Sequence, residues 1–170
     1  MWFVIVILVF VFTVGLTIGG LLAAPRDPIR PFHLLLFSLF FLFLGYIGMI
    51  TGMFMTGWMN IRFIEIVLSI LALLFIVACF SRFHPTFGFF HPEDRILLSV
   101  LALLFFLMGL EWGLLEFRTF FTITASFLFT GALGLGVFVQ MQIRQVFWKY
   151  SYISFAPLVW LLFVTVLKLL

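Results

Sequence analysis

Long apolar stretches alternate with short polar gaps along the whole chain. Several stretches reach the roughly 20 residues that a helix needs to cross the hydrocarbon core of a bilayer. None shows the period-two alternation of a barrel strand, and backbone in lipid must be either helical or part of a closed barrel. We therefore predict an all-α integral membrane protein, a bundle of about six transmembrane helices with short loops and no soluble domain. The expected helices cover residues 1–24, 32–57, 63–81, 96–116, 119–140 and 152–170.

The gaps differ in how clearly they interrupt the helices. Three prolines between residues 25 and 31 end the first apolar stretch, because proline lacks the backbone N–H that a continuous helix needs. The tightest gap runs from Glu116 to Arg118 and leaves little room for a turn. Length still requires a break there, since one helix over residues 96–140 would be about twice as long as the bilayer core is thick.

Composition supports lipid as the solvent of this chain. Of its 170 residues 66% are hydrophobic and 9% are charged, with a mean hydropathy of +1.38. A soluble domain carries roughly 25% charged residues, and a chain this short cannot hide so much apolar surface in its own interior. We expect a single transmembrane domain over residues 1–170, in contact with the lipid bilayer.

The charged and sulfur-containing residues exclude several classes of function. The net charge is +3, but the basic residues are scattered over many gaps and form no stripe for a nucleic acid backbone. The single cysteine, Cys79, excludes an intramolecular disulfide and a cysteine-based zinc site. No phosphate-binding loop, nucleophile elbow or metalloprotease motif occurs. We predict no cofactor and no metal, and we favour a non-catalytic role while leaving catalysis open.

The basic residues predict an orientation, because cytoplasmic gaps carry more lysine and arginine. The first, third and fifth gaps are the richer ones, with Arg26, Arg30, Arg82, Arg95, Arg144 and Lys149. The opposite side carries Arg62, Arg118 and Lys168. Both termini are therefore expected on the non-cytoplasmic side of a bacterial inner membrane or an organellar membrane.

One charge, Glu111, breaks the pattern because it lies inside an apolar stretch. A carboxylate in a membrane helix is costly, about 2.5–3.5 kcal/mol at the bilayer centre, and is a functional hypothesis by default. Glu111 is therefore the candidate for binding an ion or carrying a proton. The alternative is a structural carboxylate near the interface, paired with Arg118 or hydrogen-bonded across helices. Its neighbour Trp112 fits a belt of aromatic residues at that interface.

Small residues also recur at helical spacing. Glycines separated by four positions let two membrane helices approach closely. Three such pairs are present: Gly15 and Gly19, Gly48 and Gly52, and Gly109 and Gly113. They indicate either packing within the chain or association with other membrane helices.

A row of hydroxyl side chains follows the fifth expected helix. Its members, Thr119, Thr122, Ser126 and Thr130, are spaced by three or four residues and so share one helix face. This face could line a polar pathway that Glu111 reaches. It could instead form a helix–helix contact in which the hydroxyls bond to their own backbone.

Two stretches of the chain resemble each other. The residues Pro31, Ser38, Gly48 and Gly52 recur as Pro92, Ser99, Gly109 and Gly113 at one constant offset. This relates helices two and three to helices four and five and suggests a parallel internal duplication. A second match, between residues 68–75 and 98–105, has a different offset and competes with it.

These patterns lead to two functional hypotheses. The first is a non-catalytic membrane subunit or scaffold of a larger complex, a homo- or hetero-oligomer associating through small-residue helix faces. The alternative is a small transporter or ion- or proton-translocating protein that uses Glu111 and the hydroxyl face of the fifth helix.

Overall fold

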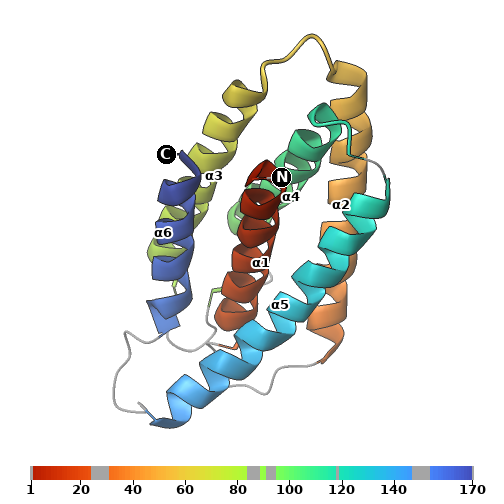
Figure 1. Cartoon of the computed structure of the whole chain (residues 1–170). Helices are drawn as coiled ribbons and strands as arrows, with labels where there is room; N and C mark the ends of the chain where they lie inside the picture. The colour runs from red at the N-terminus through yellow and green to blue at the C-terminus, as the bar shows by residue number, and fades with distance from the viewer. Residues whose placement is uncertain are drawn as a thin grey trace.

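The computed structural model describes residues 2–23, 31–83, 89–90, 95–117, 119–146 and 154–169, and the regular secondary structure of these residues is entirely helical. The predicted all-α architecture and the order of the helices are confirmed. The six helices are α1 (Trp2–Leu22), α2 (Pro31–Met55), α3 (Ile61–Ser81), α4 (Arg95–Leu114), α5 (Thr119–Val146) and α6 (Ala156–Leu169) (Figure 1).

Five helices, α1 to α5, are long and apolar enough to cross a membrane. The last helix, α6, has 14 residues and is shorter than predicted. At 1.5 Å per residue it is about 21 Å long, less than the bilayer core of about 30 Å. Pro157 lies in its first turn, where the missing N–H is tolerated because the first N–H groups of a helix have no partner within it. Ser154 and Phe155 precede it in a short 3₁₀ turn.

The fifth helix is longer than predicted. It continues past residue 140 to Val146, because glutamine and arginine are good helix formers even where the apolar pattern ends. Gln140 is buried, and Arg144 lies in the last turn, where its guanidinium donates a 3.0 Å hydrogen bond to the carbonyl of Ala23. Arg144 is therefore part of a helix rather than of the gap to which the sequence pattern assigned it.

The tight connection between α4 and α5 is a Schellman-type helix end. The N–H of Phe117 donates to the carbonyl of Trp112 and that of Glu116 to the carbonyl of Gly113, both at 3.0 Å. Glu116 adopts a left-handed backbone conformation with φ of 57°. This reversal within a few residues explains how so short a gap separates two membrane helices.

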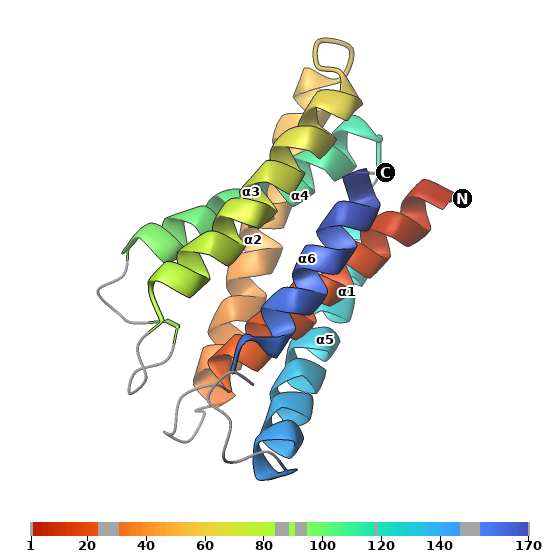
Figure 2. The same ribbon diagram turned by 90° about the vertical axis from the view of Figure 1, so that its left-hand side faces the viewer.

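The helices form a ring in which each contacts its two neighbours, in the order α1, α5, α2, α4, α3 and α6 (Figures 1 and 2). Two contacts are the most extensive, that of α2 with α4 and that of α1 with α5. Within each of these pairs the helices run in the same direction, and the two pairs run in opposite directions.

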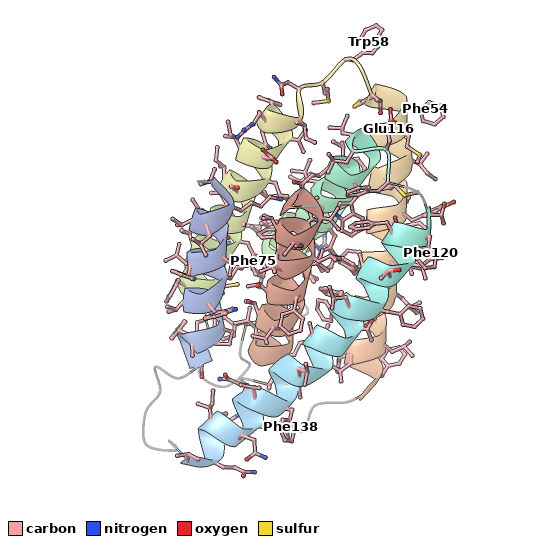
Figure 3. All side chains as sticks on the ribbon, viewed as in Figure 1. Phe54, Trp58, Phe75, Glu116, Phe120 and Phe138 are labelled. Carbon is pink, nitrogen blue, oxygen red and sulfur yellow. The ribbon has the colours of Figure 1, made fainter. Side chains whose placement is uncertain are left out.

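Aromatic side chains fill much of the interior. Phe41 of α2 stacks on Phe129 of α5 with ring centroids 4.0 Å apart, and Phe105 of α4 packs edge-on against both rings. Phe75 of α3 is also inside the bundle, whereas Trp58 projects from its end and is 93% exposed (Figure 3). The outer surface is largely apolar, as expected for contact with lipid.

Candidate functional site

Glu111 lies in the last turn of α4 and is only 1% exposed. The ammonium nitrogen of Lys168, in the last turn of α6, lies 2.7 Å from each of its carboxylate oxygens. Both side chains are almost completely buried. The two residues therefore form a two-pronged ion pair inside the helix bundle, between the fourth helix and the last.

Two further helices contribute to the surroundings of this pair. The Nζ atom of Lys168 lies 4.7 Å from the ring centroid of Phe10 in α1, a cation–π contact. Glu65, in the second turn of α3, repels Glu111 electrostatically. The ammonium group thus contacts one carboxylate, that of Glu111, and one aromatic face, that of Phe10.

The sequence pattern identified Glu111 but not its partner. The expected partner, Arg118, lies outside the described residues, and Lys168 was counted as a charge on the non-cytoplasmic side. A usable signal was present: Lys168 follows the buried residues Leu161 and Thr165 at intervals of seven and three. That spacing places Lys168 on the face of α6 that points into the protein.

Trp112 corrects the expectation of an interfacial residue at this depth. Its side chain is fully buried, with its ring against Phe41 of α2 and Phe121 of α5. Its indole Nε1 has no hydrogen-bond partner among the described residues. Helix α5 starts so soon after α4 that Phe121, in its first turn, covers the ring of Trp112. Trp112 is therefore inside the protein although it lies close to the end of α4.

The glycine pairs of α2 and α4 pack directly against each other. A Cβ atom at Gly48 would overlap the carbonyl of Phe106, and one at Gly109 would overlap that of Gly45. Gly52 and Gly113 are related in the same way, meeting the carbonyls of Leu110 and Met49 respectively. The contact is therefore symmetric about a local two-fold axis, and its two sides differ in numbering by the constant offset seen in the sequence.

Helices α1 and α5 make a second contact of the same kind. Gly15 lies against the carbonyl of Phe129, and Gly19 against that of Leu133. On the α5 side the small residues are Ala132 and Gly136, and Gly136 meets the backbone of Leu16. The sequence reading had not singled out the Ala132 and Gly136 face. All three glycine pairs that it did identify make contacts within the chain.

The hydroxyl face of α5 is directed toward α2 and not toward Glu111. Thr122 is buried and its hydroxyl contacts the sulfur of Met49 in α2 at 2.9 Å. The hydroxyls of Ser126 and Thr130 each donate to the carbonyl four residues earlier, and Thr119 is exposed at the start of the helix. The polar face and the ion pair are thus separate, since Glu111 contacts α6.

A groove of about 470 Å³ opens on the outside of the bundle between α2 and α5. On the α5 side its lining includes the small residues Ser126, Thr130 and Gly134. The α2 side supplies Ser38 and several leucines, and the hydroxyl of Ser38 donates to the carbonyl of Leu34. The groove is apolar apart from these small hydroxyl residues, whose protons are already donated to the backbone.

Within the described ranges, no group of three or more histidine, cysteine, aspartate or glutamate side chains is arranged to hold a metal ion. Comparison of the chain with protein-family models, with curated proteins and with solved structures found no match.

Proposed function

We propose that this multi-pass membrane protein is a non-catalytic subunit or scaffold that binds another hydrophobic helix along the groove between α2 and α5. The observation that supports this is the row of small residues Ser126, Thr130 and Gly134, which are spaced by four positions and line the open groove. A Cβ atom at Gly134 would meet nothing within 4 Å. This row can therefore admit a further helix at close range.

The chain itself shows how such a row is used. On another face of α5, Ala132 and Gly136 have the same four-residue spacing and are covered by α1. Helix α5 thus carries two small-residue faces, one filled within the chain and one open to the surroundings. A partner helix along the groove would give the second face the contact that α1 gives the first.

The glycine pairs identified in the sequence do not supply this binding surface. The pairs beginning at Gly15, Gly48 and Gly109 are occupied by helices of the same chain and are closed to a partner. The groove lies along the membrane-spanning parts of α2 and α5, so its occupant must be apolar. A second copy of this chain and a different membrane protein are the two forms that such a partner can take.

Site-specific photo-crosslinking in native membranes tests the proposal. A photoreactive amino acid at Thr130, in the groove, should give a discrete protein adduct that two differently tagged copies of the chain identify as homo- or hetero-oligomeric. The matched control is Val77, an exposed position on the outer face of α3. Adducts with lipid alone at both positions would contradict the proposal.

A second experiment fills the groove. Gly134→Leu should dissociate the complex in mild detergent, because the added side chain occupies the space of the partner helix. Val77→Phe, which adds bulk on a different outer face, should leave the complex intact. Equal behaviour of the two variants would mean that the groove is not the binding surface.

The buried ion pair favours a second candidate function, translocation of an ion or a proton through Glu111. Ionisable groups inside membrane spans mark ion and proton pathways in many transporters. Glu111→Gln should then abolish flux in proteoliposomes, and Glu111→Gln/Lys168→Met, which removes both charges, should abolish it as well. Flux that survives in the correctly folded double variant would assign the pair a structural role.

A further inference from the structure

The surroundings of the Lys168 ammonium group have the chemistry of a binding site for a primary amine. Both oxygens of Glu111 accept from Nζ at 2.7 Å, and the face of Phe10 lies 4.7 Å away. Carboxylates and aromatic faces are the groups that recognise ammonium ions in proteins.

This site also links α6 to the rest of the bundle. The helix lies against α1 and α3, and Lys168 extends from its last turn to α4. At the other end of α6, the hydroxyl of Thr17 shares its proton between the carbonyl of Thr13, at 2.8 Å, and that of Pro157, at 3.2 Å. The short helix is thus held by a polar contact near each end, with the apolar side chains of Leu158 and Leu161 buried between them.

Removal of either charge would leave the other one buried without a partner. An unpaired charge inside a protein is strongly destabilising, whereas removal of both charges can be close to neutral. Because Lys168 belongs to the shortest helix, we expect α6 to separate from its neighbours before the other helices do.

We propose that Glu111 and Phe10 form a binding site for a primary ammonium group, which Lys168 fills from within the chain, so that α6 is released when either charge is left unpaired. The site is separate from the groove between α2 and α5. Its ligand is an alkylammonium ion, and its occupation affects the placement of the last helix.

The docking of α6 can be measured by thiol labelling in membranes with a permeant maleimide. The reporter is Thr165→Cys, at a position on α6 that is 0% exposed, and the control is Ala125→Cys, a buried position on α5. Both are made in a Cys79→Ala background. Glu111→Gln should raise the labelling rate at position 165 by about tenfold or more and leave position 125 protected.

A double variant separates loss of docking from general misfolding. Glu111→Gln/Lys168→Met should restore protection at position 165, because it leaves no unpaired charge. Unchanged labelling in Glu111→Gln, or an equal rise at positions 165 and 125, would overturn the docking role.

The ammonium site itself is tested by chemical rescue. Lys168→Ala removes a propylammonium-sized group, so added n-propylammonium should return the labelling rate at position 165 toward that of the parent. Propanol, which is neutral and of the same size, should not, and neither amine nor alcohol should act on Glu111→Gln/Lys168→Ala. Absence of rescue by the amine, or equal rescue by propanol, would overturn the site.

Discussion

At the scale of single residues, the glycines of this protein have different roles that their sequence context does not distinguish. Gly109 lies so close to the backbone of Gly45 that no side chain fits between the helices. Gly131, also in the interior of a helix, has nothing within 4 Å of the position of a Cβ atom. Gly109 is thus required for the close approach of α2 and α4, and Gly131 is not required by any neighbour.

A matched pair of substitutions follows from this difference. Gly109→Ala should lower the free energy of unfolding by about 1–3 kcal/mol, because the added methyl group forces the helices apart. Gly131→Ala should raise it by up to about 1 kcal/mol through helix propensity alone. Unfolding in mixed detergent micelles, followed by circular dichroism, measures both. Equal effects of the two substitutions would contradict the packing that the structure shows.

At the scale of elements, the end of α4 decides how two membrane helices can follow each other so closely. Its two closing hydrogen bonds, from Glu116 and Phe117, require a left-handed residue at position 116. Glycine is the residue that most often fills this position, and a side chain branched at Cβ is disfavoured there. The glutamate at this position is tolerated at some conformational cost.

Substitution at position 116 tests the geometry of this turn. Glu116→Val should lower the free energy of unfolding by about 1 kcal/mol or more relative to Glu116→Gly, because valine disfavours the left-handed conformation. The comparison uses the same detergent unfolding measurement, with Thr119→Val as a control at a nearby exposed position in ordinary helical conformation. Valine and glycine of equal stability at position 116 would contradict the assigned turn.

At the scale of the whole molecule, the ring of helices is built from two parallel pairs that point in opposite directions. The N- and C-terminal ends of the described chain lie toward the same end of the bundle as the connection between α2 and α3 (Figures 1 and 2). These three segments therefore lie on the same side of the membrane. The positive-inside rule predicts that this side is the non-cytoplasmic one.

Labelling of whole cells with a membrane-impermeant maleimide tests the orientation. In the Cys79→Ala background, Trp58→Cys should react from outside, because this exposed residue lies at the end predicted to be non-cytoplasmic. Ser81→Cys, exposed at the opposite end of α3, should react only after the membrane is permeabilised. The reverse pattern would invert the predicted orientation.

The all-helical architecture and the order of its six helices could be predicted from the lengths of the apolar runs and the positions of prolines and charges, because both follow from the thickness and polarity of a bilayer. Glu111 and the glycine pairs could also be identified from the sequence. A charge within an apolar run and a four-residue spacing of glycines are both visible without knowledge of the fold. The internal duplication stays a prediction, although the contact of Gly48 with Phe106 and that of Gly109 with Gly45 obey its offset.

The contacts of these residues could not be predicted from the sequence and became visible in the packed helices. Glu111 and Lys168 are far apart in the chain and on different helices, so only the packing of α6 in the bundle brings them together. The glycine faces turned out to be filled by the chain's own helices, and the hydroxyl face of α5 to border a groove rather than the ion pair. The physical reason is that helix periodicity specifies a face, whereas the neighbour of that face depends on how all the helices pack together.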